Sequence, residues 1–150
     1  MARATRGKAL PKNSFDKLFS EDEANELIPR LEILIRQLQM QATSLRARVE
    51  ELSVNDASIV HCELNEIVSR YPELRSFTTN MASAANQIES LGCVLKDIDQ
   101  GLVDFPYDAG EEVVFLCWQF GEPHIVAWHT VDSGFSGRKP LPGAAKTYLH

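Results

Sequence analysis

The first half of the chain contains two seams of apolar residues at helical spacing. In the first seam, apolar residues recur at alternating intervals of three and four, as on one face of a helix. Ser20 and Glu23 form a capping box, so we expect this helix to begin at Glu21. Pro29 predicts a kink or a short separate turn before it, and the long helical segment is expected to begin with Pro29 in its first turn. The seam consists of Ile28, Leu31, Ile35, Leu38, Ala42, Leu45, Val49 and Leu52.

The second seam follows a chain reversal at residues 53–56, where Ser, Asn and Asp side chains favour a turn. It ends before Gly92, a residue typical of a helix C-terminus. Pro72 interrupts the seam, but the register is the same on both sides. We therefore favour a kinked continuous helix over two helices joined by a loop. The seam consists of Val60, Leu64, Ile67, Tyr71, Leu74, Thr78, Met81, Ala85 and Ile88.

The two helices are predicted to form an antiparallel hairpin that is too long for a small sheet to cover. A helix over residues 29–52 is about 36 Å long, whereas a typical strand spans ~17–20 Å. Leu27 and Leu34 widen the apolar face at the end near the sheet and should contact it. We expect a second copy of the hairpin to cover the far end, which gives a homodimer. The apolar residues of that end are Met40, Leu45, Val49, Ile59, Val60 and Val68.

After Gly92 the apolar period changes to two, which is typical of strands. Pro106 is expected to end the second strand, and the third strand is apolar on both faces and should be central. The predicted fold class is α+β, a long antiparallel helical hairpin (coiled-coil-like) followed by a small three- or four-stranded antiparallel sheet. The strands are expected at residues 93–98, 102–105, 113–120 and 125–131.

These patterns divide the chain into a disordered basic arm (1–18), the helical hairpin (19–92), a β module packed on the hairpin (93–141) and a tail (142–150). The net charge is −6, yet residues 1–17 contain five basic residues against Asp16 alone. We interpret this arm as a mobile, dispensable segment, with nucleic-acid binding as the weaker alternative.

The chain has no signal-peptide pattern and no apolar run long enough to span a membrane. Its three cysteines have no repeated spacing, which indicates reduced thiols. We therefore expect a cytoplasmic protein without a membrane partner, and no cofactor is indicated.

Several motifs together resemble a known family. Residues 19–31 read Phe-Ser-Glu-Asp-Glu-Ala-Asn-Glu-Leu-Ile-Pro-Arg-Leu and precede a helical middle. They are followed by residues 101–106, Cys117-Trp118, Gly121-Glu122, Trp128-His129 and residues 134–140. This pattern, over most of residues 19–141, resembles the bacterial family catalogued as domain of unknown function 2203. Because that family is uncharacterised, the resemblance implies no activity.

The candidate chemistry lies in the last third of the chain. Asp104 stands in an apolar strand, where a buried carboxylate without a partner would cost several kcal/mol. His129 and Arg138 are its candidate partners, and the alternative is that Asp104 faces water. We expect Asp104, His129 and Arg138 to form one polar cluster, and Trp128 is included with them as a candidate ligand-binding residue.

Cys117 and His129 are weak candidates for metal ligands. If three residues connect strands three and four, both side chains lie on one sheet face within reach of one ion, whereas a four-residue connection separates them. A histidine hydrogen-bonded at the sheet edge is the alternative. Residues 134–138, Gly-Phe-Ser-Gly-Arg, could bind an anion through backbone N–H groups and Arg138, or they could be a connector whose arginine pairs with a carboxylate.

The leading hypothesis is a non-enzymatic, cytoplasmic, dimeric interaction or binding module. A small-molecule or metal-dependent enzyme with its site on the β module is the first alternative. A nucleic-acid accessory protein that uses the basic arm is the second.

Overall fold

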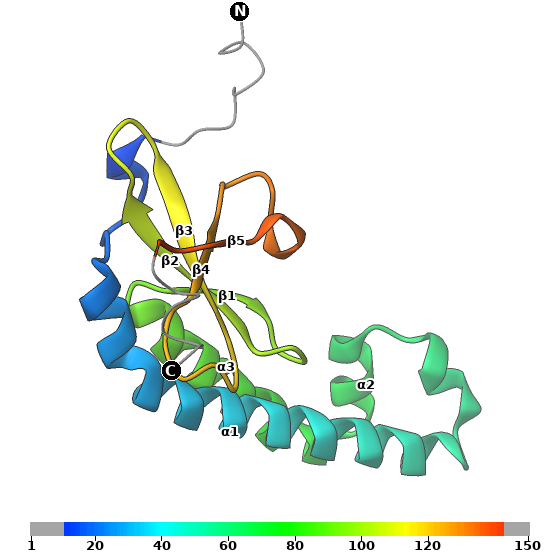
Figure 1. Cartoon of the computed structure of the whole chain (residues 1–150). Helices are drawn as coiled ribbons and strands as arrows, with labels where there is room; N and C mark the ends of the chain where they lie inside the picture. Colours follow the sequence, from blue (N-terminus) through cyan, green and yellow to red (C-terminus); the bar gives the residue numbers. More distant parts are fainter. Residues whose placement is uncertain (1–10, 143–150) are drawn as a thin grey trace, which may run out of the picture.

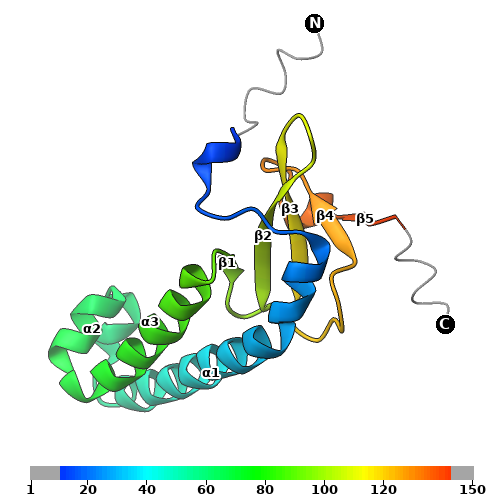
Figure 2. The ribbon, with the colours of Figure 1, turned by 90° about the vertical axis from the view of Figure 1, so that its left-hand side faces the viewer.

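The computed structural model describes residues 11–142 and has the α+β architecture expected from the sequence. Two long helices, α1 (Glu21–Ser53) and α3 (Arg75–Ser90), pack along each other, and an antiparallel sheet lies at one end of the pair (Figure 1). A short helix, α2 (Leu64–Arg70), lies at the other end (Figure 2). No helix in the described part of the chain has the length and apolar character that a membrane span requires.

Helix α1 begins where the capping box predicts. The Ser20 side chain accepts a hydrogen bond from the Glu23 backbone N–H at 3.1 Å, and the Glu23 carboxylate accepts one from the Ser20 N–H at 2.9 Å. The expected separate turn before Pro29 is wrong, because one helix runs from Glu21 to Ser53 with Pro29 inside it. The other expectation, a kink, agrees with the bend between the first turns of α1 and the rest of the helix (Figure 2). Pro29 removes one backbone donor, but Ile28 and Leu31 on either side are almost fully buried, and this packing holds the helix together.

The second half of the hairpin is broken at Pro72, so the expectation of a kinked continuous helix is wrong. After α1 the chain forms η3 (Ala57–His61), α2, η4 (Pro72–Leu74) and then α3. Tyr71 has φ −125° and ψ 80°, outside the helical region, because a proline disfavours helical geometry in the residue before it. The Tyr71 hydroxyl donates to Asp56 at 2.7 Å, which fixes the turn against the loop.

This irregular segment folds back over the far end of the helix pair. Ile59, expected to be left exposed, is fully buried, and Leu45 is 7% exposed. A small core of Leu45, Ile59, Ile67 and Leu74 forms there, and Val68 packs against it. The chain therefore covers part of the surface that we assigned to a second copy, although Met40 and Val60 stay about three-fifths exposed at 63% and 61%.

Gly92 ends α3 as expected, with φ +96°, a left-handed conformation that glycine adopts without strain. Five antiparallel strands follow in simple meander order within the described residues, where three or four were expected. Strand β2 continues through Pro106 instead of ending there, and the Pro106 carbonyl accepts a hydrogen bond from the Phe19 N–H at 2.7 Å. The strands are β1 (Val94–Asp97), β2 (Leu102–Asp108), β3 (Val113–Gln119), β4 (Ala127–His129) and β5 (Lys139–Pro140).

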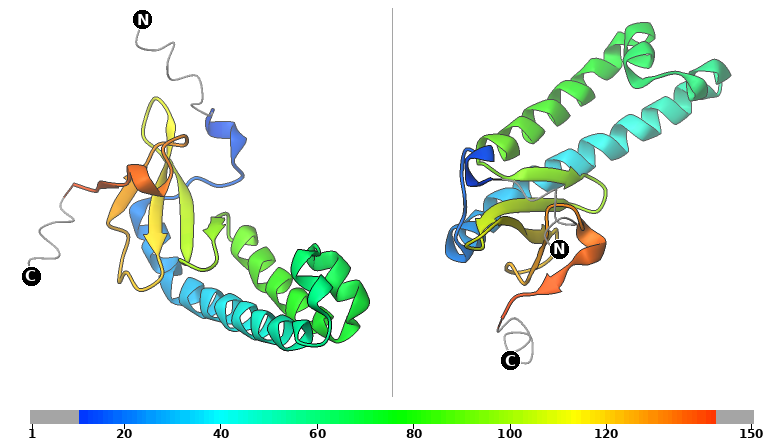
Figure 3. Two further views of the ribbon diagram at one scale, coloured as in Figure 1. Left: turned by 90° about the vertical axis from the view of Figure 1, so that its right-hand side faces the viewer. Right: turned by 90° about the horizontal axis from the view of Figure 1, so that it is seen from above.

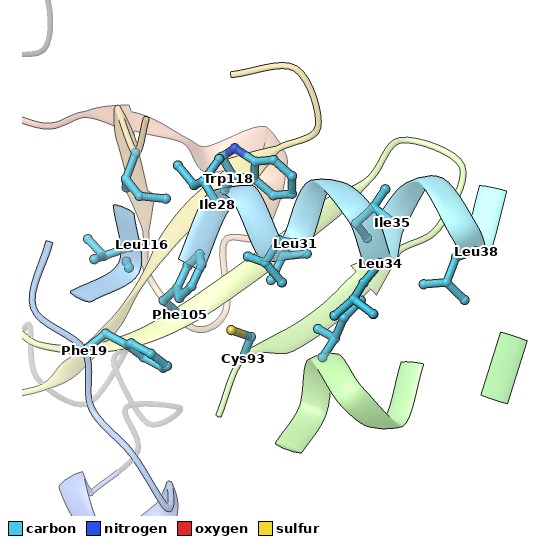
Figure 4. Packing of buried hydrophobic residues seen from close by; sticks show 14 of the residues in the cluster. Phe19, Ile28, Leu31, Leu34, Ile35, Leu38, Cys93, Phe105, Leu116 and Trp118 are labelled. Carbon is cyan, nitrogen blue, oxygen red and sulfur yellow. The ribbon is translucent and has the colours of Figure 1, made fainter. Parts of the chain in front are cut away.

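One face of the sheet packs on α1. Leu31 and Ile35 of the helix meet Phe105 and Trp118 of the sheet in one core, and each of the four is fully buried (Figure 4). Leu27 and Leu34 belong to the same packing, as predicted for the end of the hairpin near the sheet. Strand β3 lies between β2 and β4, which confirms its central place.

The N-terminal segment runs beside the sheet. Of the expected arm, residues 1–10 lie outside the described residues, as do residues 143–150 of the tail. Lys12 pairs with Asp108 at 3.2 Å, and the Phe15 ring packs edge-on against Phe115 with centroids 5.7 Å apart. Residues 11–18 thus lie against the folded body and are not a free arm.

Candidate functional site

Asp104, Cys117 and His129 come from three neighbouring strands and meet on one face of the sheet. Asp104 is paired with Cys117 across β2 and β3, and Cys117 is paired with Ala127 across β3 and β4. His129, two residues beyond Ala127, is therefore a diagonal neighbour of Cys117 on the same face. This is the register that we expected if three residues connect strands three and four. The three residues are only 2%, 1% and 2% exposed.

This face is the one turned away from α1. The residues that alternate with Asp104 in β2 and with Cys117 in β3 pack into the core on α1. They are Val103, Phe105, Leu116 and Trp118. Figure 3 (right) shows α3 beside the β1 edge of the sheet and β5 at the opposite edge, and the segment after His129 leads to β5. On this face the Phe115 ring lies beside His129, with centroids 5.5 Å apart, and Phe15 of the N-terminal segment packs on Phe115.

Both ring nitrogens of His129 are engaged. Nδ1 lies 2.7 Å from the Thr130 carbonyl oxygen, which can only accept, so Nδ1 bears a proton. Nε2 lies 2.9 Å from Oδ2 of Asp104. Burial alone would lower the pKa of His129, but its hydrogen bonds to Asp104, Cys117 and Thr130 outweigh burial and raise that pKa above its usual range. His129 and Asp104 therefore form a buried ion pair.

Cys117 completes a set of three potential metal ligands. The Cys117 sulfur, one His129 ring nitrogen and one Asp104 carboxylate oxygen all lie within 4.8 Å of one another. Thiolate, imidazole and carboxylate groups are the ligands that zinc uses in proteins. The sequence analysis paired Cys117 with His129 as weak candidates, and the structure adds Asp104 to them.

Arg138 lies next to this cluster, but its charge is not paired with Asp104. Its Nη2 donates to the Cys117 carbonyl oxygen at 3.2 Å and to the Glu122 carboxylate at 2.6 Å. Of the two candidate partners of Asp104, His129 pairs with it, whereas Arg138 pairs with Glu122. Glu122 is well placed because the Gln119 N–H also donates to it at 2.7 Å. Anion binding by residues 134–138 would require the charge of the Arg138 guanidinium, and the Glu122 carboxylate neutralises that charge.

Trp128 is separated from the cluster. It precedes His129 in β4, so its side chain lies on the opposite face of the sheet, where it packs at the edge of the core on α1. The Lys139 ammonium group lies 5.1 Å from the centre of its ring. The structure therefore brings together Asp104 and His129 among the predicted site residues, with Arg138 beside them and Trp128 elsewhere.

Two partners were missed by the sequence reasoning. Thr130 contributes a backbone carbonyl oxygen, and because every residue has one, no pattern marks it. Glu122 was noted in the sequence only as part of the Gly121-Glu122 motif, without a partner. A charged residue next to a buried strand was the available signal for its pairing with Arg138.

A second candidate site is an apolar groove at the far end of the helix pair. It encloses about 470 Å³ between the last turns of α1 and the segment of η3 and α2. Val60 and Leu64 both line it and are themselves 61% and 46% exposed. Its other lining residues are Leu45, Arg46, Val49, Glu50, Ser53 and Ile67.

Comparison with known proteins gives one match. Searches of curated proteins and of solved structures found none. A family model described as uncharacterized conserved protein (DUF2203) matches residues 17–141, which include the three α-helices and five strands of the described residues and every residue of the buried cluster. The chain therefore belongs to the uncharacterised family DUF2203.

Proposed function

We propose that this protein is a non-enzymatic interaction module that forms a homodimer through the groove of η3, α2 and the end of α1. The observation that supports this proposal is the apolar character of the groove together with the exposure of Val60 and Leu64 on its rim. Exposed apolar side chains that adjoin an apolar groove are typical of interaction surfaces.

A second copy of the chain is the proposed occupant because the surface offers protruding side chains and a groove side by side. In a twofold-symmetric dimer the same patch meets itself, so Val60 and Leu64 of each copy can enter the groove of the other. Full burial of one such side chain contributes ~1.5–3 kcal/mol, so four from two copies can hold a dimer. The sequence assigned the whole far end of the hairpin to the dimer interface. Because the folded-back segment already covers Ile59 and Leu45, the proposed interface is limited to the groove.

Two features support a non-enzymatic role in the cytoplasm. Cys62, Cys93 and Cys117 are free thiols, which fits a reducing compartment. In the buried cluster both ring nitrogens of His129 are hydrogen-bonded within the protein and the residue is only 2% exposed, so neither nitrogen faces a site where a substrate could bind.

The proposal is tested by the mass of the full chain in solution, measured by light scattering during gel filtration. The wild-type protein should elute as a dimer, and the double variant Val60→Glu, Leu64→Glu should be a monomer with an unchanged circular dichroism spectrum. Ile33→Glu is the matched control, because Ile33 is an exposed apolar residue of α1 (51%) that does not line the groove. A wild-type monomer at high micromolar concentration, or a double variant that stays dimeric, would refute the proposal.

A further inference from the structure

We propose that Asp104, Cys117 and His129 are the protein ligands of one divalent transition-metal ion of the zinc class. The three ligand atoms lie within 4.8 Å of one another and come from adjacent strands of a rigid sheet. Atoms bound to one zinc ion lie about 3–4 Å apart, given metal–ligand distances of about 2.0–2.3 Å. The separations in the structure, at most 4.8 Å, therefore exceed those distances by no more than about 1–2 Å.

The orientation of His129 supports this assignment. A metal-bound histidine almost always donates its second ring N–H to a carbonyl or carboxylate oxygen, which fixes the ring and its tautomer. His129 makes that bond through Nδ1 to the Thr130 carbonyl oxygen at 2.7 Å. The other nitrogen, Nε2, is directed toward Asp104 and is the nitrogen that would bind the ion. The same ring position is therefore held with or without the ion.

The ligand types select the class of metal. A thiolate and an imidazole favour zinc and related transition metals over magnesium or calcium, which prefer oxygen ligands. Arg138 holds the Cys117 backbone by a hydrogen bond to its carbonyl oxygen. Cys93 is also buried, but it lies in the core on α1 and is on the other side of the sheet (Figure 4). Cys117 is therefore the thiol of this site.

A cysteine nucleophile activated by a histidine and an aspartate is a different use of the same three residue types. In such a triad one ring nitrogen faces the carboxylate and the other faces the thiol. Here the Thr130 carbonyl oxygen takes Nδ1 and the Asp104 carboxylate takes Nε2. The geometry therefore favours a metal over a nucleophile.

Cobalt(II) is the probe for the first experiment, because a thiolate bound to cobalt gives an intense near-ultraviolet absorption band. The full chain, purified without an affinity tag and treated with a chelator, should bind one cobalt ion and show this band, and added zinc should abolish it. Cys117→Ser should lose the band, and Asp104→Asn should bind zinc roughly tenfold or more weakly. Cys62→Ser, which changes a partly exposed thiol elsewhere, is the control and should bind as the wild type does.

A second measurement keeps the test decisive if the buried variants do not fold. Zinc should raise the melting temperature of the wild-type chain and of the Cys62→Ser control alike, as read by circular dichroism. A wild-type protein with no cobalt band and no zinc-dependent change in melting would overturn the proposal and leave Asp104 and His129 as a structural ion pair. A band that survives in a folded Cys117→Ser protein would overturn it as well.

Discussion

The buried Asp104–His129 pair allows a double-mutant test of the sheet's polar cluster in the absence of metal. The two side chains are 2% and 3% exposed and lie 2.9 Å apart, so neither charge has water as an alternative partner. Removal of one partner of a buried ion pair typically costs ~3–5 kcal/mol, because the other charge is left unpaired. We therefore expect Asp104→Leu and His129→Leu each to destabilise the protein by about that amount.

The double variant should be far more stable than the sum of the single changes implies. With both charges gone, no unpaired ion is left in the apolar layer, and such replacements are often close to neutral. The Thr130 carbonyl still loses its donor, which costs about 1 kcal/mol. The expected loss is therefore ~1–2 kcal/mol for the double variant, against ~6–10 kcal/mol for the sum of the single variants.

The measurement is equilibrium unfolding in urea at pH 7 with a chelator present, so that metal binding does not contribute. If a single leucine variant is unfolded, Asp104→Asn replaces it in the cycle, with an expected loss of ~1.5–3 kcal/mol for the charged hydrogen bond. A double variant whose loss equals the sum of the two single losses would show that the residues do not interact. The reasoning from their 2.9 Å contact would then be wrong.

Three further outcomes follow from single residues. Gly101→Ala should cost ~2–4 kcal/mol in urea unfolding, because Gly101 has φ +68° and a Cβ there would lie 2.5 Å from the Cβ of Phe120. Gly121 has φ +104° but open space around it, so Gly121→Ala should lose only the stability that comes from the strained backbone conformation. Equal losses of stability in Gly101→Ala and Gly121→Ala would contradict the steric argument. Hydrogen bonds, of which that from Ser58 has the largest effect, lower the pKa of Asp56 from 3.8 to about 2. The ionised Asp56 carboxylate therefore stabilises the fold above pH 3.8, and this stabilisation is lost as the pH falls toward 2. The melting temperature of Asp56→Asn should accordingly fall less over that range than the wild type's, and parallel curves would exclude the effect. Burial, with a smaller effect of Glu89, raises the pKa of Cys93 to about 12, so iodoacetamide at pH 8 should modify Cys93 only after unfolding, as mass spectrometry can show.

The sequence alone determined the local signals. The start of α1 follows from Ser20 and Glu23, and the end of α3 follows from Gly92, because each signal acts within a few residues. Apolar periodicity likewise identified the contact of Leu34 with the sheet and the central place of β3. These features depend on which residues are neighbours along the chain.

Tertiary structure decided the features that depend on distant neighbours. Pro29 lies inside a helix because packing on both sides outweighs one lost hydrogen bond, whereas Tyr71 before Pro72 leaves the helix. Ile59 is buried because the chain folds back after α1, which no periodicity indicates. The cluster itself depends on register: a shift by one residue between β3 and β4 would place His129 on the opposite face from Cys117. The sequence supplied the three ligand types, and only the pairing of the strands brought them together.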